Sequence, residues 1–426
     1  MKRFPADFLF GVATSSFQIE GALDADGRGR SIWDGFAGES GDLGTVACDH
    51  YRRWHDDVEL LGELGVDAYR FSLAWPRIYP DGRGAVEQRG LAHYDRLIDA
   101  LLERGIEPVV TLYHWDLPQA LQDEGGWRNR ATVDAFADYA RTCFDAYGDR
   151  VNRWITINEP WVHGILGHYD GMHAPGEKDL RGALQAIHHM LLAHARVADA
   201  GIAFSLFPTY PASVDDADVD AARICDGYHN RWFLDAVLKG SYPDDMRALF
   251  EQRVGSLDFV QDGDLLPQDG GFLGVNYYSR GVIRAEPGKE PLPYHVLSAR
   301  EEMDVPLTDG GYEIAPFGLT DLLVRLRDDY GEIPVFITEN GAIYKDAPHD
   351  PGRVAFLYDH LGAVHDAIEQ GAPVRGYFHW SFMDNFEWAL GYEPRFGLVH
   401  VDYDTFERTI KDSGRAYGEI ARGNGL

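Results

Sequence analysis

Residues 153–160 of the chain read RWITINEP, a β-rich run that ends in a glutamate, Glu159. Residues 334–341 read PVFITENG and carry a second glutamate, Glu339, beside an asparagine. Isoleucine, valine, threonine and aromatic residues favour β-strands, so each run is a predicted strand with a glutamate at its carboxyl end. The proline after Glu159 favours an extended backbone at the glutamate and ends the first strand there.

Similar β-rich runs recur outward from these two, and each is followed by a segment that can form a helix. Residues 90–102, for example, have apolar side chains at helical spacing. Alternating strands and helices require a parallel sheet, and eight such units predict an α/β fold, a closed (β/α)8 TIM barrel. The eight runs are residues 8–14, 68–75, 107–115, 153–159, 201–207, 272–278, 334–339 and 374–381.

The domain organisation follows from the length and from the missing linkers. A chain of 426 residues can hold two or three average domains or one large barrel. No Pro/Gly/Ser-rich linker divides it, so we expect a single domain over residues 1–426. Residues 281–311 and 342–350 follow the sixth and seventh runs, and we expect them to be long loops that shape an active-site pocket.

The composition narrows the classes of partner. Hydrophobic residues make up 45% of the chain, enough for a large core, and the formal net charge is -30. Such an acidic balance disfavours nucleic acid and anionic membrane surfaces, which both need a basic patch. Three scattered cysteines disfavour a disulfide framework or a zinc cluster. Neither a signal-like apolar segment nor an apolar run of about 18 residues is found, so a cytoplasmic protein is expected.

The two strand-end glutamates are the candidate catalytic residues. In a parallel barrel all strands open their carboxyl ends on one face, where Glu159 and Glu339 can meet. Two carboxyl groups are sufficient for cleaving a glycosidic bond, because one can protonate the leaving oxygen while the other attacks the sugar or activates water. The alternative is that each glutamate only caps a loop. Two of them in matching contexts favour the catalytic interpretation.

Four further motifs extend the pattern over nearly the whole chain. They read FLFGVATSSFQIEG (residues 8–21), YRFS (69–72), YHWDLP (113–118) and WSFMDNFEW (380–388). With these and the two glutamate motifs, the chain resembles members of glycoside hydrolase family 1, the β-glucosidase and β-galactosidase family, from residue 8 to about residue 413. The resemblance implies a retaining mechanism with Glu159 as the acid/base and Glu339 as the nucleophile.

The resemblance also implies partners for these two residues. Arg70 and Tyr278 would hold the nucleophile ionised, since a guanidinium and a donated hydrogen bond both favour a carboxylate. Asn158 would bind the substrate 2-hydroxyl group. The implied substrate-binding set is Gln18, His114, Trp115, Asn158, Asn276, Tyr278, Tyr312, Trp380, Glu387, Trp388 and Phe396, with Trp380 as the stacking platform.

Some residues bear on the choice of substrate within the family. Plant thioglucosidases of the family have glutamine in place of the acid/base, whereas this chain has Glu159. A carboxylate at Glu387 would repel a 6-phosphate, and the following loop offers only Arg395 as a phosphate ligand. Tyr312 and Phe317 stand where relatives commonly have Trp and Glu, so the preference for the leaving group is left open.

We therefore expect a cofactor-free and metal-free hydrolase of terminal β-D-glucosides, including cello-oligosaccharides, that also accepts β-D-galactosides or β-D-fucosides. The alternatives are a galactosidase, mannosidase or transglycosidase of the same family, and a sugar-binding barrel without catalysis. A metal-dependent hydrolase is a weaker alternative. His188, His189 and His194 lie on one predicted helix, but no His-Glu-x-x-His motif is present. The oligomeric state is left open.

Overall fold

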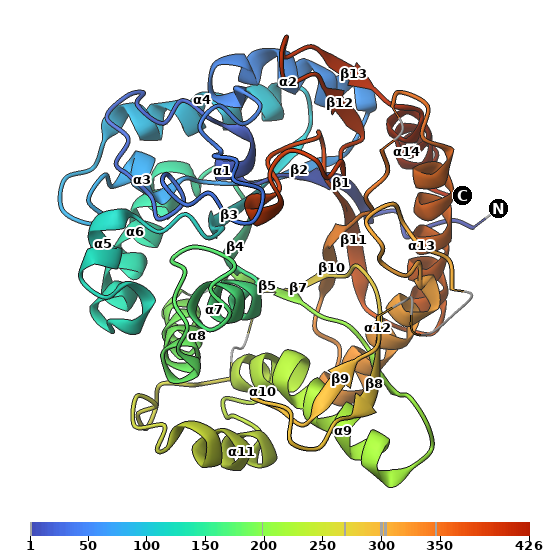
Figure 1. The fold of residues 1–426 in the computed structure, drawn as a ribbon. Helices are drawn as coiled ribbons and strands as arrows, with labels where there is room; N and C mark the ends of the chain where they lie inside the picture. Colours follow the sequence, from blue (N-terminus) through green and yellow to red (C-terminus); the bar gives the residue numbers. More distant parts are fainter. Residues whose placement is uncertain (1, 198, 268–269, 299–300, 302–304, 346) are drawn as a thin grey trace.

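The computed structural model describes residues 2–197, 199–267, 270–298, 301, 305–345 and 347–426. Within them, eight parallel strands close into a barrel that is surrounded by helices (Figure 1). The strands follow one another around the barrel in chain order, so the predicted TIM barrel is confirmed. They are β1 (Leu9–Ala13), β2 (Ala68–Ser72), β3 (Glu107–Tyr113), β4 (Arg153–Asn158), β5 (Gly201–Ser205), β7 (Leu273–Asn276), β10 (Val335–Asn340) and β11 (Val374–Trp380).

Each predicted run coincides with one of these strands. Seven runs contain their strand completely, and β10 extends one residue beyond the predicted run 334–339. Most runs are longer than the strands because their last residues leave the hydrogen-bonded ladder and turn into the loops of the carboxyl face. Several candidate site residues are among those last residues.

Helices cover the outside of the barrel. The predicted helix over residues 90–102 corresponds to α4 (Gln88–Glu103). The other α-helices are α1 (Ser16–Ile19), α2 (His50–Leu64), α3 (Trp75–Ile78), α5 (Gln119–Asp123), α6 (Ala131–Tyr147), α7 (Pro160–His168), α8 (Leu180–Ala195), α9 (Asp216–Asp226), α10 (Trp232–Leu238), α11 (Asp244–Val254), α12 (Pro316–Tyr330), α13 (Pro351–Glu369) and α14 (Asp412–Gly423). Short 3-10 segments, η1 (Gly126–Arg128) and η3 (Trp388–Leu390), and a π-helical turn, η2 (Gly227–Arg231), complete the helical elements of the described residues.

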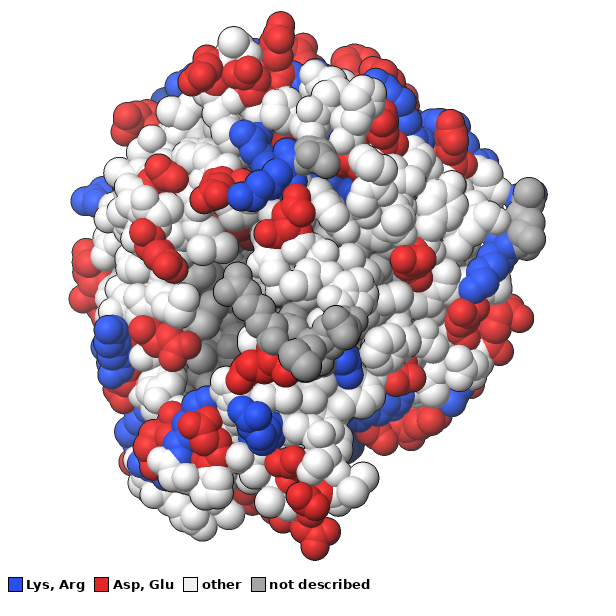
Figure 2. Space-filling view, turned by 45° about the vertical axis from the view of Figure 1, so that its right-hand side comes forward, with Lys and Arg blue, Asp and Glu red and all other residues white. Residues whose placement is uncertain are grey.

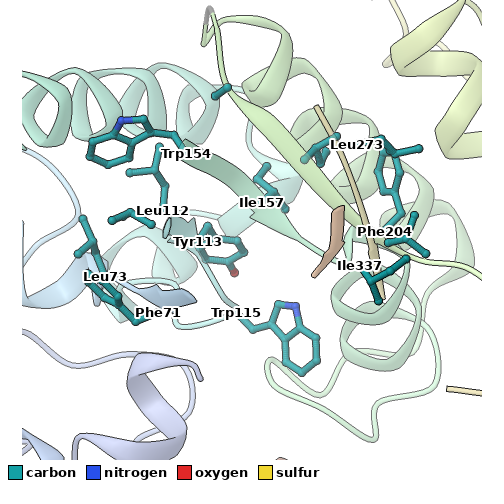
Figure 3. Packing of buried hydrophobic residues seen from close by; sticks show 14 of the residues in the cluster. Phe71, Leu73, Leu112, Tyr113, Trp115, Trp154, Ile157, Phe204, Leu273 and Ile337 are labelled. Carbon is teal, nitrogen blue, oxygen red and sulfur yellow. The ribbon is translucent and has the colours of Figure 1, made fainter. Parts of the chain in front are cut away.

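The core has two layers. A small cluster includes Ala13, Ala68, Val109, Ile155, Ala203, Phe336 and Phe378, which come from seven different barrel strands and so fill the barrel interior. A much larger cluster packs the strands against the surrounding helices. Figure 3 shows its side chains from β2, β3, β4, β5, β7 and β10. Because both faces of the strands are buried, the β-rich runs are apolar almost throughout.

Secondary structure outside the barrel corrects one expectation. Residues 281–311 do not form only a loop, because they contain β8 (Gly281–Ala285) and β9 (Tyr294–Val296), which join β6 (Thr209–Pro211) in a three-stranded sheet beside α9 (Figure 1). Local sequence gave no sign of this sheet, since β6 lies about 70 residues earlier in the chain. The described part of residues 342–350 is free of helix and strand, as expected. A second small sheet pairs β12 (Val399–Val401) with β13 (Arg408–Ile410).

Candidate active site

The two candidate glutamates line one pocket. Glu159 directly follows β4, and Glu339 is the penultimate residue of β10. The carboxyl ends of the barrel strands bring both to a cavity of about 190 Å³. The register of the β4–β5 and β7–β10 ladders shifts next to these residues, which re-aims side chains at the strand ends.

The backbone of Glu159 differs from the prediction. The proline that follows predicts an extended conformation, but Glu159 has φ 49° and ψ 69°, in the left-handed region. This conformation turns the chain from β4 directly into α7, which begins at Pro160. A left-handed residue other than glycine is uncommon, and such residues cluster at functional sites.

The Glu339 carboxylate has two strong partners. Nη1 of Arg70 donates to its Oε1 at 2.7 Å, and the hydroxyl of Tyr278 donates to its Oε2 at 2.8 Å. Burial raises the pKa of Glu339, while Arg70 and Tyr278 act in the opposite direction because both stabilise the ionised form.

The Glu159 carboxyl group has a weaker set of contacts. Its Oε1 accepts a hydrogen bond of 2.9 Å from the side-chain amide of Asn276. Burial, followed by the charge of Glu339, raises the pKa of Glu159 to about 8. Glu339 therefore ionises first, and Glu159 keeps its proton at neutral pH. Two identical side chains in one pocket thus differ in their tendency to ionise.

A hydrogen-bonded network behind the glutamates fixes their neighbours. Oδ1 of Asn158 accepts from Nη2 of Arg70 at 2.7 Å and from Asn276 at 3.0 Å. The Asn158 amide lies 3.1 Å from Nε2 of His114. Burial holds the pKa of His114 well below its usual value, so the ring is neutral and Nε2 accepts this bond. The ring proton is then on Nδ1, which has no partner among the described residues.

Thr338 is a contributor that the sequence analysis missed. Its hydroxyl donates to Oδ1 of Asn276 at 2.6 Å, and this bond turns the amide nitrogen of Asn276 toward Glu159. Threonine is an ordinary strand residue, and a single sequence carries no signal that separates this one from the rest.

Aromatic side chains form the walls of the pocket. The rings of Trp115 and Trp388 lie 4.7 Å apart between centroids. His114 is stacked parallel to Trp380 at 5.9 Å and to Trp388 at 6.0 Å. Tyr312 also lines the pocket and is 47% exposed. Phe317 is exposed as well but does not line the pocket.

A third carboxyl group, Glu387, lies in the same pocket. Burial and the charge of Glu339 raise its pKa to about 8. The side-chain amide of Gln18 donates to Asn385 at 3.0 Å, to the carbonyl of Phe386 at 2.9 Å and, more weakly, to Glu387 at 3.4 Å. These bonds join α1 to the segment that carries Glu387.

The predicted site residues fall into two groups. Ten of them line the pocket, namely His114, Trp115, Glu159, Tyr278, Tyr312, Glu339, Trp380, Glu387, Trp388 and Phe396. The other four, Gln18, Arg70, Asn158 and Asn276, are fully buried directly behind the lining and hydrogen-bond to the carboxyl groups or to one another. The structure therefore brings together all fourteen residues in this one region.

The histidine run and Arg395, which the sequence analysis also considered, have hydrogen-bond partners of their own. The run His188, His189 and His194 is buried in α8, where His188 binds Asp264 and Tyr242 and His189 binds the carbonyl of Trp127. No group of three potential metal-ligating side chains was found among the described residues. Arg395, the other residue considered, donates from Nη1 to Asp384 at 3.1 Å and so is already paired with a carboxylate.

Acidic and basic side chains are both spread over the face of the molecule shown in Figure 2. None of the helices in the described segments is long and apolar enough to cross a membrane.

Comparison with known proteins assigns the family. The model of glycosyl hydrolase family 1 matches residues 1–426. The chain belongs to glycosyl hydrolase family 1. A family 1 relative, the 1,4-beta-D-glucan glucohydrolase of Thermotoga neapolitana, is 45% identical, with 100% of both chains covered. The bifunctional beta-D-glucosidase/beta-D-fucosidase of Bifidobacterium breve is 44% identical, with 96% of each chain covered.

The fold of a solved family 1 structure agrees closely with this one. The β-glucosidase from Thermotoga maritima in complex with deoxynojirimycin superposes with a TM-score of 0.94 at 44% identity, over 100% of both chains. The similarity therefore extends over the whole length of both chains.

Proposed function

We propose that this protein is a retaining β-glycosidase that removes terminal β-D-glucosyl residues through a covalent glycosyl-enzyme. The observation that carries the proposal is the unequal environment of Glu159 and Glu339 in one pocket. Arg70 and Tyr278 favour an ionised Glu339, while the Glu159 carboxyl group accepts its hydrogen bond, among the described residues, from the neutral amide of Asn276. A retaining glycosidase needs one carboxylate and one protonated carboxyl group about 5–5.5 Å apart.

In the first step, the Glu339 carboxylate attacks the anomeric carbon and forms an ester bond to the sugar. Glu159 gives its proton to the glycosidic oxygen, so the aglycone leaves as a neutral alcohol. Once Glu339 is esterified, its negative charge is lost, and the pKa of Glu159 falls because that charge was one of the causes that raised it.

In the second step, the ionised Glu159 accepts a proton from water, which attacks the anomeric carbon from the side the aglycone has left. The ester bond to Glu339 breaks, and Glu339 regains its charge beside Arg70 and Tyr278. Two inversions at one carbon give net retention of configuration.

The remaining site residues bind the sugar in this proposal. Asn158 and His114 contact inner hydroxyl groups. Gln18 and Glu387 bind the outer hydroxyl groups, and Trp380 stacks against the sugar ring. Asn276 orients the acid/base, while Trp115, Trp388, Phe396 and Tyr312 form the walls.

Cellobiose and cello-oligosaccharides are the proposed natural substrates. The relative from Thermotoga neapolitana is named a 1,4-beta-D-glucan glucohydrolase, and the one from Bifidobacterium breve also a β-D-fucosidase. These names support glucosides first and fucosides second. The single domain, the cytoplasmic location and the galactoside activity stay predictions.

Proton NMR of the first product from 4-nitrophenyl β-D-glucoside tests the proposal. We expect β-glucose to appear before mutarotation produces the α anomer. If α-glucose appears first, the enzyme inverts, and Glu339 is not the nucleophile. If the protein binds glucose without turning over any glucoside, galactoside, mannoside or fucoside, it is a sugar-binding barrel.

A substitution tests the nucleophile directly. Glu339→Gln keeps the size of the side chain but removes the attacking charge, and we expect kcat to fall by on the order of 10⁴-fold or more. Circular dichroism and Tm, measured alongside, must show a folded protein. Near-normal turnover of the folded variant would overturn the assignment.

A further inference from the structure

Much of the proposed sugar-recognition wall comes from one loop. Residues 385–396, here named the recognition loop, follow β11 and carry Glu387, Trp388 and Phe396, which line the pocket. Apart from the short segment η3, the described loop contains no regular secondary structure. Something other than a helix or a sheet must therefore hold these three side chains in place.

The loop begins and ends at the same point in space. Asp384 precedes it and Gly397 follows it, and the backbone amide of Gly397 donates to Oδ1 of Asp384 at 3.0 Å. A Cβ atom on Gly397 would lie 2.1 Å from the backbone nitrogen of Asp384, so only glycine permits this approach. The amide of Asp384 in turn donates to the carbonyl of Val399 at 2.9 Å.

The carboxylate of Asp384 is the centre of this junction. Nζ of Lys411 donates to its Oδ1 at 2.8 Å, and Nη1 of Arg395 donates to its Oδ2 at 3.1 Å. Nδ1 of His400 lies 3.3 Å from Oδ2. Asp384 and Lys411 are both fully buried. One carboxylate therefore joins the start of the loop to its end, to a loop arginine and to the N-cap of α14.

Side chains within and after the recognition loop make further contacts at the same junction. Arg395 also donates to the carbonyl of Val401 at 2.8 Å and lies 4.2 Å from the ring centroid of Tyr403. The hydroxyl of Tyr403 donates to the carbonyl of Asn385 at 3.0 Å. Asn385 is also the residue whose side chain accepts from Gln18 at 3.0 Å, so the junction is connected to α1, which follows the neighbouring strand β1.

We propose that Asp384 is a positioning residue for sugar recognition, which fixes the recognition loop and thereby the places of Glu387, Trp388 and Phe396 in the pocket. The inference rests on the proposed function, since it assumes that these three side chains contact the sugar. Asp384 itself lies outside the pocket lining and contacts no reacting atom. Its loss therefore weakens sugar binding through displaced side chains.

The test compares Asp384→Asn with a matched control, Asp226→Asn. Asp226 is a buried carboxylate on α9 that also holds two cations, Arg231 at 3.0 Å and Arg325 at 2.6 Å, and it has no contact with the recognition loop. Both variants remove a buried carboxylate that pairs with two or more cations, and both lower Tm. Only Asp384→Asn is expected to weaken the binding of deoxynojirimycin, measured as Kd by calorimetry, on the order of tenfold to a hundredfold.

A second comparison separates positioning from stability. The double variant Asp384→Asn/Lys411→Met also removes the buried cation that Asp384→Asn leaves without a carboxylate. It is the variant to measure if the single variant does not fold. We expect its Tm to recover toward the wild-type value while the Kd stays raised. A Kd within twofold of wild type in the folded double variant, or an equal change in Asp226→Asn, would overturn the inference.

The wild-type protein distinguishes this inference from the proposed function. If the wild type hydrolyses 4-nitrophenyl β-D-glucoside and binds deoxynojirimycin, the proposed function is supported. The variants then test only the positioning role of Asp384. If the wild type neither hydrolyses a glycoside nor binds the inhibitor, the proposed function fails first, and the role of Asp384 in sugar recognition fails with it.

Discussion

At the scale of single residues, the groups around the carboxyl oxygens set the charge states of the two glutamates. The pKa of Glu159 is raised to about 8, so the acid is protonated below that pH and loses its proton as the pH rises. We expect kcat/KM to fall above pH about 8. In Glu159→Gln this fall should vanish for a 2,4-dinitrophenyl glucoside, whose leaving group needs no proton.

Glu387 has a pKa raised to a similar value, so it needs its own control. Glu387→Gln lowers sugar affinity, but the fall of kcat/KM on the basic side should remain. If the fall disappears in Glu387→Gln and remains in Glu159→Gln, Glu159 is not the acid.

The hydroxyl of Tyr278 gives a second residue-scale prediction. Because it donates to the ionised Glu339, it lowers the pKa of Glu339, and Tyr278→Phe raises it. Since Glu339 must be ionised to attack, we expect the acidic limb of the pH profile to move up by roughly 1–2 pH units.

The neighbouring Tyr277 is the matched control. Its hydroxyl donates to the carbonyl of Ala315 and not to a glutamate, so Tyr277→Phe can lower Tm but leaves the acidic limb in place. If the acidic limb of the pH profile lies at the same pH in both variants and in the wild type, the Tyr278 hydroxyl does not act on Glu339.

At the scale of elements, the ends of β10 and β11 approach each other very closely. A Cβ atom on Gly341 would lie 1.8 Å from the carbonyl oxygen of Trp380. We expect Gly341→Ala to push the two strand ends apart, cost about 1–3 kcal/mol of stability and lower kcat/KM on the order of a hundredfold.

Gly62, inside α2, serves as the control for this substitution. A Cβ atom there would meet only Cδ of the Arg104 side chain, at 3.7 Å. Gly62→Ala should therefore stabilise the helix by about 0.5–1 kcal/mol and leave kcat/KM unchanged. Thermal unfolding and steady-state kinetics measure both variants.

The elements also show how far the sequence predicts the molecule. The eight barrel strands were predictable because each is a β-rich run with apolar side chains on both faces. The sheet of β6, β8 and β9 was not, because its pairing joins segments far apart in the chain. Within the site, Glu159 and Glu339 could be recognised by their motifs, whereas Thr338 and Asp384 act through contacts that only the fold creates.

At the scale of the whole molecule, the net charge of -30 sets the response to salt. Acidic residues exceed basic ones, so many carboxylates have no cation to pair with and repel one another. Between about 0.01 M and 1 M NaCl the Debye length falls from about 30 Å to about 3 Å, which screens this repulsion. We expect Tm to rise by several degrees over this range.

Screening also weakens the surface ion pairs, and that effect has the opposite sign. Exposed pairs contribute only about 0–1 kcal/mol each, so the relief of repulsion should dominate. KCl should give the same rise as NaCl, because the mechanism involves charge and not ion identity. A steady fall of Tm with salt would mean that the ion pairs outweigh the net charge.

The size of the pocket has a consequence for long substrates. At about 190 Å³ it is smaller than the cavities of about 300–1,000 Å³ that hold drug-sized ligands, so it admits one sugar ring. Every chain, however long, then offers a single cleavable bond at a time. At equal mass concentration, the rate of glucose release is therefore proportional to the number of chain ends and not to the number of linkages. A mixture of oligosaccharides becomes shorter by one sugar at a time, from one end.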